Sequence, residues 1–317
     1  MSSAAPAVPL VSIVLPTHNG TRYLRQSVES CLGQTHRNVE LVIVDDASTD
    51  ATPQIVASFA DSRIVSLRNH RNLGLPASLN VGFARTGGEY LTWTSDDNWY
   101  EPNALERMLD FLTERQARFV RCDYILHRAD GEVPDQRVEL PESARFETSN
   151  PVGACFLYHR SVREAVGGYD PEASLAEDYD YWIRAAQKFT LHRLAEPLYH
   201  YRHHPGSLSA RRARDRGVRI AAALVRLKHR VTDMEREAGL LAEDLGWSRY
   251  RVRPLPFRTA GRLLRILSGG RVELAKPSLS GALSECRNIL RGYADGQMPM
   301  AEAARRLSSL FATTGGA

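Results

Sequence analysis

The stretch that decides the fold is Glu89-Tyr-Leu-Thr-Trp-Thr-Ser-Asp-Asp-Asn98, in which two adjacent carboxylates follow a short apolar run. The run over 89–93 is typical of a buried strand. Ligands of open α/β sheets bind outside the carboxyl ends of the strands, so we expect Asp96 and Asp97 at such an edge. Paired carboxylates there favour a cation, and the cation would face an anionic ligand such as a diphosphate.

Strands and helices alternate around this stretch from Leu10 to about Arg202. The periodicity predicts strands at 10–15, 39–44, 63–67, 89–93, 119–126 and 153–158, and helices at 23–32, 48–59, 76–85, 102–115 and 177–188. The polar residues 130–150 are predicted to form a loop. The first turn, 16–20, lacks Gly-x-Gly-x-x-Gly, which counts against a dinucleotide-binding Rossmann domain.

The composition is that of an ordinary soluble protein, with 317 residues of which 43% are hydrophobic and 25% charged. Its four cysteines form no Cys-x-x-Cys pair, so neither a zinc cluster nor a disulfide framework is indicated. The N-terminus lacks the segments of a signal peptide, and no run approaches the roughly 18 apolar residues of a spanning helix. We therefore expect a cytoplasmic protein.

Basic charge is concentrated in the last third of the chain. Residues 211–276 contain 17 Lys and Arg against 7 Asp and Glu, whereas the remainder contains 24 against 30. A heptad-spaced apolar seam predicts a helix about three heptads long through Leu224, Leu227, Val231, Met234, Ala238, Leu241 and Leu245. Residues 256–267 form a candidate basic amphipathic helix. We therefore expect a first domain at 8–210 and a helical, basic region at 211–317.

Three roles remain open for this basic region. Residues 211–276 would suit anionic headgroups at the inner face of the cell membrane, as a peripheral contact. The seam would equally suit a homodimer, and the region could simply pack on the first domain. Nucleic-acid binding is not expected, because there is no aromatic interleaving or recognised module.

Three acidic pairs follow three different elements of the predicted fold. Asp45 and Asp46 come after the second strand, Asp96 and Asp97 after the fourth, and Glu177 and Asp178 begin a later helix. Any one pair could merely cap a helix. Their order and surroundings together carry more information than each pair alone.

With these surroundings included, the chain resembles the inverting glycosyltransferases of family 2. The segments that carry the resemblance are 11–20, 41–50, 72–74 with Asn80, 94–98, 167–170, 176–178 and 201–207. The resemblance implies an α/β GT-A fold, Rossmann-like with a mixed central sheet, followed by a mostly helical C-terminal region. It also implies transfer of a sugar from a nucleotide-diphosphate sugar, with UDP expected, to a hydroxyl of a glycan, lipid-linked or small-molecule acceptor, as in polysaccharide biosynthesis.

The resemblance assigns the nucleotide to the first loop and to polar residues after later strands. These residues are Pro16, Thr17, His18, Asn19, Asp45, Asp46, Asn72, Asn80 and Asp96. A carboxylate among them can accept the imide N–H of uracil, which would select a pyrimidine. His18 stands where relatives most often carry tyrosine, so its ring would stack on the base or, alternatively, close the loop.

The resemblance also assigns a Mn²⁺ or Mg²⁺ ion to Asp97. The family's Asp-x-Asp is here Ser95-Asp96-Asp97, so Ser95 supplies no carboxylate. His204, with His203 as a competing candidate, would complete the metal shell or contact the diphosphate, and imidazole suits Mn²⁺ better than Mg²⁺. The ion would neutralise the charge of the leaving diphosphate.

Asp178 is the implied general base, which removes the proton of the acceptor hydroxyl, and Glu177 would orient it. The alternative is a helix N-terminus stabilised by two acids. A sugar nucleotidyltransferase is a rival class, but it carries a glycine-rich basic loop that 16–20 does not provide. A non-catalytic sugar-nucleotide-binding protein is a second rival, and it would be expected to lack Asp97 or Asp178.

Overall fold

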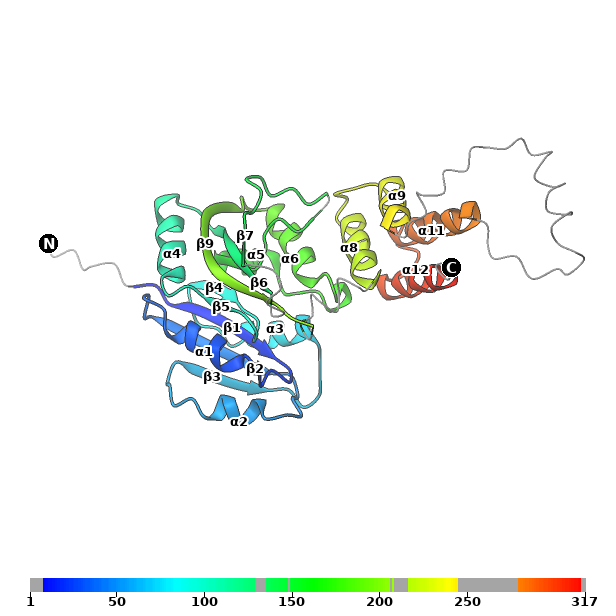
Figure 1. Ribbon diagram of the computed structural model, residues 1–317. Coiled ribbons are helices and arrows are strands. Elements are labelled where there is room, and N and C mark those ends of the chain that lie inside the picture. Colours follow the sequence, from blue (N-terminus) through cyan, green and yellow to red (C-terminus); the bar gives the residue numbers. More distant parts are fainter. Residues whose placement is uncertain are drawn as a thin grey trace, which may run out of the picture. The chain divides into compact units, whose positions relative to one another are not determined.

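The computed structural model describes residues 8–128, 135–147, 149–205, 207, 216–244 and 279–314. The chain divides into two compact units, Met1–Arg214 and Asp215–Ala317, which are treated separately below (Figure 1). The boundary expected between residues 210 and 211 falls outside the described residues and stays a prediction.

The first unit is built on a nine-stranded mixed sheet in the order β3-β2-β1-β4-β8-β6-β9-β5, with β7 paired to β6. β1, β2, β3 and β4 are parallel, whereas β8 pairs antiparallel with β4 and β6. The strands are β1 Val11–Thr17, β2 Val39–Asp45, β3 Ile64–Arg68, β4 Tyr90–Trp93, β5 Trp99–Tyr100, β6 Phe119–Arg128, β7 Gln136–Val138, β8 Cys155–His159 and β9 His192–His203. An α/β fold with a mixed central sheet is confirmed.

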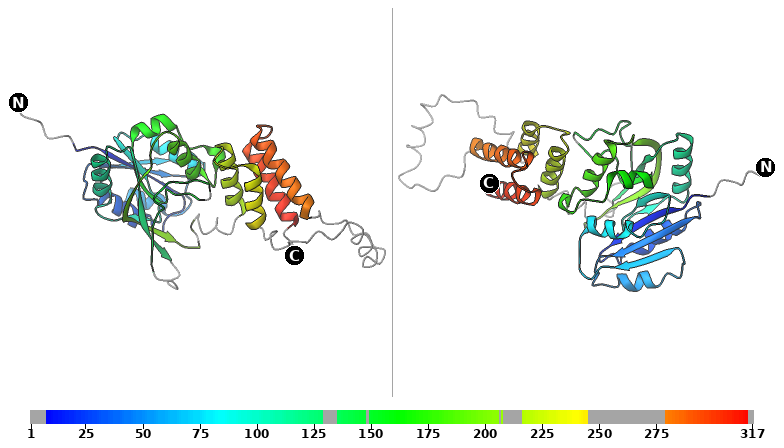
Figure 2. Two further views of the ribbon diagram at one scale, coloured as in Figure 1. Left: turned by 90° about the horizontal axis from the view of Figure 1, so that it is seen from above. Right: turned by 180° about the vertical axis from the view of Figure 1, so that it is seen from behind.

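Helices cover both faces of this sheet (Figure 2). They are α1 Leu24–Leu32, α2 Thr52–Ala57, α3 Leu75–Phe83, α4 Ala104–Glu114, α5 Arg160–Val166 and α6 Glu177–Ala186, with a 3₁₀ turn η1 at Pro171–Ala173. Side chains alternate along a strand, so Ile13 of β1 joins the core under α1 and α4, while Val14 faces α3. The predominantly apolar sequence of β1 and β2 follows from this burial on two faces.

The structure contains elements that periodicity did not indicate. The expected loop at 130–150 includes β7, and α5 and β5 are additional. The largest addition is β9, a 12-residue strand whose pairing with β6 is irregular around Asp123, opposite Pro197. Proline lacks the N–H that a regular ladder requires, which explains both the irregularity and the missing strand signal.

The second unit contains four described helices, α8 Arg216–Lys228, α9 Met234–Asp244, α11 Leu279–Ala294 and α12 Met300–Thr314. The expected three-heptad helix is wrong, because the chain turns between α8 and α9, where Arg230 has a φ of 55°. Leu224 and Leu241 are buried on opposite sides of this turn. Arg226 of α8 and Glu237 of α9 form a buried bidentate ion pair, at 2.7 Å for each bond.

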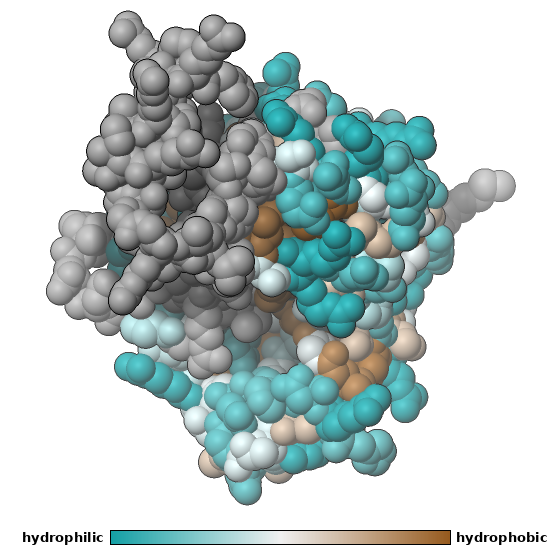
Figure 3. Space-filling view, turned by 90° about the vertical axis from the view of Figure 1, so that its right-hand side faces the viewer, coloured by the Kyte–Doolittle hydropathy of each residue, from teal (hydrophilic) through white to brown (hydrophobic). Residues whose placement is uncertain are grey.

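The surface of the described residues is largely hydrophilic on the face drawn in Figure 3, with small separate hydrophobic areas. The exposed large hydrophobic side chains among these residues are Val8, Val65 and Leu73. A search of the described helices found none with the length and apolar character needed to cross a membrane. The candidate amphipathic helix at 256–267 and Leu245 of the seam lie outside the described residues.

A glycine allows α3 to pack closely on β1 and β2. A Cβ at Gly82 would lie 2.4 Å from Val14 Cγ1 and 3.1 Å from Val44 Cγ2. We expect Gly82→Ala to lower the free energy of unfolding by about 1–3 kcal/mol through overpacking, although alanine favours a helix by up to about 1 kcal/mol. Thermal unfolding measures this. Gly239→Ala in α9, where the Cβ would have no neighbour within 4 Å, is the control and should be neutral or stabilising; equal effects of the two changes would contradict the close packing.

Candidate active site

A cavity of about 500 Å³ lies at the carboxyl ends of the parallel strands. The ends of β1 and β2 meet there, since Thr17 pairs with Asp45, and β4 runs parallel beside β1. Nine of the predicted site residues line the cavity: Pro16, Thr17, His18, Asn19, Asn72, Asp46, Asp96, Asp97 and His204. Asp45, Asn80, Glu177 and Asp178 do not belong to its lining.

The first loop is fastened to the loop after β2 by its two polar side chains. His18 Nδ1–H donates to the carbonyl oxygen of Asp46 at 2.7 Å, which defines the tautomer of the neutral ring. Asn19 has a φ of 56° and its Oδ1 accepts from the N–H of Thr49 at 2.8 Å. His18 therefore both closes the loop and faces the cavity, so its two predicted roles are compatible.

The acidic pair after β2 shapes the cavity wall. Asp46 accepts backbone N–H bonds from Leu73 at 2.8 Å and Gly74 at 2.9 Å, which holds the 72–74 loop against the cavity. Asp45 is nearly buried, where it pairs with Arg68 and accepts from the N–H of Ser48. Asp46 thus belongs to the cavity lining and Asp45 does not, and contact of either residue with the nucleotide stays a prediction.

The carboxylates after β4 are the most strongly perturbed groups of the site. Burial raises the pKa of Asp96 to about 6, against a hydrogen bond from Thr17 and with a further contribution from the charge of Asp97. Burial also raises the pKa of Asp97 to about 6, while Arg202 opposes the shift. His204 Nε2 lies 3.2 Å from Asp97 Oδ2. Two partly buried acids whose ionisation is disfavoured by desolvation, with an imidazole beside Asp97, form an environment that a cation would stabilise.

Asp97 and His204 are the side chains that could hold a divalent cation. Mg²⁺ and Mn²⁺ are commonly bound by one or two protein groups, with phosphate and water oxygens as the remaining ligands. Within the described residues no three His, Cys, Asp or Glu side chains are grouped to hold a metal. The donor set therefore fits an ion that arrives with a nucleotide diphosphate.

α6 begins at Glu177 and carries Asp178 in its first turn. Asp178 Oδ1 accepts from the N–H of Tyr179 at 2.7 Å, and its Oδ2 accepts from Asn150 Nδ2 at 2.9 Å. Burial raises the pKa of the Tyr169 phenol well above its usual value, the Asp178 carboxylate adds to this, and Trp93 of β4 opposes it. Glu177 is buried beside Asp178.

Asn80 has a structural task in the described fold. Its Nδ2 donates to the carbonyl of Tyr169 and its Oδ1 accepts from the N–H of the same residue, both at 2.8 Å. A Cβ at Gly168 would lie 2.8 Å from Asn80 Oδ1, so a larger residue at this position would crowd the Asn80 side chain. A direct contact of Asn80 with the nucleotide stays a prediction.

Some residues of the site were not anticipated from the sequence. A Cβ at Gly20 would lie 2.2 Å from Asp96 Oδ2, so this glycine leaves room for the carboxylate. Arg202 stacks on Tyr23, with 3.9 Å between its Cζ and the ring centroid, and its N–H donates to Asn98 Oδ1. The resemblance of residues 201–207 to the family included Arg202 but did not indicate its partners Tyr23 and Asn98. Nothing in the sequence indicated a role for Asn150.

Comparisons with known proteins identify the family of the chain. The model of the family described as "Glycosyl transferase family 2" matches residues 12–167. A Bacillus subtilis protein named "Putative teichuronic acid biosynthesis glycosyltransferase TuaG" is 31% identical over 208 residues, which cover 64% of this chain and 82% of that protein. The chain therefore belongs to glycosyl transferase family 2, which confirms the resemblance seen in the sequence.

Other relatives extend the comparison. The Rickettsia typhi protein named "Uncharacterized glycosyltransferase RT0329" is 32% identical over 187 residues, or 56% of this chain, and the match spans only 58% of that relative. The crystal structure of S. aureus TarS 1–349 in complex with UDP superposes with a TM-score of 0.57 at 17% identity, covering 96% of this chain and 90% of the TarS 1–349 chain. The structural likeness confirms the fold class.

Proposed function

We propose that this protein is a metal-dependent inverting glycosyltransferase that uses a nucleotide-diphosphate sugar, with UDP as the nucleotide. The observation that carries the proposal is the partly buried Asp96–Asp97 pair, with raised pKa values, beside His204 in the cavity at the strand ends. Crystal structures of TarS in complex with UDP and with UDP-GlcNAc support the choice of nucleotide. The name of TuaG supports an acceptor in polysaccharide biosynthesis.

The nucleotide would bind across the first loop and the 72–74 loop. Thr17 and His18 line one wall, and the chain around Asp46 lines another. The His18 ring, fixed by its bond to the Asp46 carbonyl, would present one face to a base. These walls are set by hydrogen bonds within the protein, so the site would be largely formed before the donor arrives.

Asp97 and His204 would hold Mn²⁺ or Mg²⁺ at the diphosphate. The bound ion supplies positive charge that stabilises the leaving diphosphate. Asp96, held by Thr17, would order the ribose or metal-bound water. Arg202, which already opposes the raised pKa of Asp97, would add positive charge on the same side of the site.

Asp178 would act as the general base. It would take the proton of the acceptor hydroxyl as that oxygen attacks the anomeric carbon from the face opposite the diphosphate, which inverts the configuration. The position of Asp178 at the start of α6, outside the cavity lining, is consistent with a base on the acceptor side.

The rival classes have less support. A sugar nucleotidyltransferase would need a glycine-rich basic loop after β1, and residues 16–20 instead form a loop tied to Asp46 and Ser48. A non-catalytic binding protein would not require Asp178. Membrane contact and a homodimer depend on the region 211–276, much of which lies outside the described residues, and both stay predictions.

A thermal-shift experiment tests donor binding. UDP-sugars with Mn²⁺ at about 100 times Kd should stabilise the protein by roughly 2.7 kcal/mol, which is about 5–10 °C for a domain of this size. Mn²⁺ alone should give a much smaller shift, since the phosphates complete its coordination. GDP and ADP with Mn²⁺ are the controls. Equal shifts with all nucleotides would contradict UDP selection, and the absence of any metal-dependent shift would contradict the metal. The anomeric configuration of the product, read by NMR, tests inversion.

A further inference from the structure

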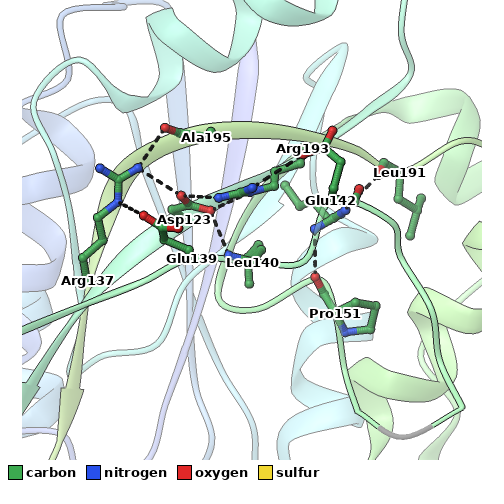
Figure 4. A network of polar contacts seen from close by, with 10 residues as sticks. Asp123, Arg137, Glu139, Leu140, Glu142, Pro151, Leu191, Arg193 and Ala195 are labelled. Carbon is green, nitrogen blue, oxygen red and sulfur yellow. Dashed lines mark hydrogen bonds and ion pairs between the residues drawn. The ribbon is translucent and has the colours of Figure 1, made fainter.

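The segment between β7 and β8, described over residues 139–147 and 149–154 and here called the β7–β8 segment, is anchored to the interior of the first unit. Figure 4 shows the polar network that anchors it, with Asp123, Arg193 and the carbonyl of Pro151 among the labelled groups. Such anchoring is unusual for a surface connection, which normally has few buried partners. The segment therefore has a defined course, and its last polar side chain before β8 is that of Asn150.

One end of the segment is fixed by Asp123 of β6. This carboxylate is completely buried and accepts from Arg193 Nε at 2.9 Å, from Arg193 Nη2 at 2.8 Å and from the N–H of Leu140 at 3.0 Å. Burial opposes its ionisation, but these donors together with Arg137 hold the pKa of Asp123 below its usual range. An ionised, fully paired carboxylate therefore fixes the backbone at Leu140.

The other end is fixed by Arg121, also on β6 and also completely buried. Its guanidinium donates to three carbonyl oxygens, those of Leu191 at 3.1 Å, Pro151 at 3.1 Å and Glu142 at 2.7 Å. Pro151 directly follows Asn150. The backbone next to Asn150 is thus held by the planar, buried guanidinium group of Arg121.

A third attachment joins the segment to α6. The Tyr179 hydroxyl donates to the carbonyl of Phe146, and the two rings pack with centroids 5.9 Å apart. Tyr179 follows Asp178, so the helix that carries the proposed base and the segment that carries Asn150 are held together beside the contact between these two residues.

The Asn150 amide has one orientation. Its Oδ1 accepts from the N–H of Val152 at 3.1 Å, so Nδ2 must face Asp178, where it donates to Oδ2 at 2.9 Å. The N–H of Tyr179 binds the other carboxylate oxygen at 2.7 Å. Donors on both oxygens restrict rotation of the carboxylate and favour its charged form over its protonated form.

We infer that Asn150 is a positioning residue for the general base, and that Arg121 and Asp123 hold the β7–β8 segment so that Asn150 reaches Asp178. The inference rests on the proposed role of Asp178. Among the described residues, the titratable groups around Asp178 include its neighbour Glu177 on α6 and the phenol of Tyr169. Asn150 supplies an N–H donor to this acidic surrounding from a different part of the chain.

Asn150→Ala and Asn150→Asp test the inference, with transfer of sugar from the UDP-sugar measured as kcat, KM and a pH–rate profile. Asn150→Ala should lower kcat about 10- to 100-fold, because the base is no longer held in line, and should leave donor KM unchanged. The acidic limb of the profile should move to higher pH, because the charged base has lost a donor. Asn150→Asp keeps the shape of the side chain but places a second carboxylate against Asp178. The acidic limb of its pH–rate profile should therefore move to still higher pH.

The neighbouring Ser149 is exposed, so Ser149→Ala is the matched control and should behave like the wild type. Unchanged kcat and an unmoved acidic limb in both Asn150 variants would overturn the inference while leaving the proposed function intact, provided that Asp178→Asn is inactive. Loss of donor binding together with a large fall in Tm would also overturn it, in favour of a purely structural role. Full transfer by Asp178→Asn would instead remove the proposed base and the inference together.

Discussion

Replacing Asp178 by asparagine should lower kcat by about 10²- to 10⁴-fold and leave donor binding intact. A positioned general base contributes a factor of this size, and the amide keeps the shape of the side chain but cannot take a proton. Asp178 lies outside the cavity lined by Asp46, Asp96 and Asp97, so the nucleotide and its metal should bind as before. Initial rates of transfer at saturating donor, together with the thermal shift given by UDP-sugar and Mn²⁺, measure both parts of this prediction.

Glu172→Gln provides a matched control for this change. Glu172 is an exposed acid in the 3₁₀ turn that precedes α6, and the same acid-to-amide substitution there should not alter kcat. If Asp178→Asn weakened donor binding as strongly as it lowered kcat, Asp178 would be a structural residue of the helix start. A variant with normal kcat would place the base elsewhere in the first unit.

The elements that the sequence predicted are those with local signals. β1 and β2 are mainly apolar and mostly buried, interrupted near their starts by Ser12 and Glu40, and the acidic pairs follow strands whose carboxyl ends must meet at one edge. The cavity residues of the first loop and of β4 could therefore be assigned before any coordinates. Asp45 and Asn80 were predicted to belong to the same site. Their partners Arg68 and Tyr169 are distant in sequence and could not be predicted, and contact of Asp45 or Asn80 with the nucleotide stays a prediction.

The parts that the sequence did not predict depend on long-range pairing. β9 includes Pro197, and its apolar and polar residues alternate poorly. It nevertheless pairs with β6 through much of its length. Asn150 reaches Asp178 only because Arg121 binds a carbonyl 30 residues away along the chain. Neither the pairing of β9 nor the contact of Asn150 with Asp178 is indicated by a periodic pattern in the sequence. The three-heptad seam failed for a related reason, since apolar spacing cannot reveal a reversal at Arg230.

Replacing Asp97 by asparagine should remove the metal-dependent part of donor binding and make the metal-free protein more stable at neutral pH. The first effect follows because the amide is neutral and is a weak ligand for Mg²⁺ or Mn²⁺. At about 100 times Kd, the lost stabilisation is roughly 2.7 kcal/mol. Thermal shifts with UDP-sugar, with and without Mn²⁺, measure it. Asp110→Asn, a change at an exposed position of α4, is the control and should keep the full shift.

The second effect follows from the pKa of Asp97, which burial raises to about 6 from the ordinary value of 3.8. The folded protein then binds a proton more readily than the unfolded chain between these two values, so stability falls as the pH rises through this window. Above pH 6 the charged carboxylate destabilises the fold by on the order of 3 kcal/mol, because a tenfold change in proton affinity corresponds to about 1.4 kcal/mol. Asparagine removes that cost. Metal-free Asp97→Asn should therefore exceed the wild type in Tm at pH 7.5 but not at pH 4, whereas a variant less stable at both pH values would show that Asp97 supports the fold rather than a cation.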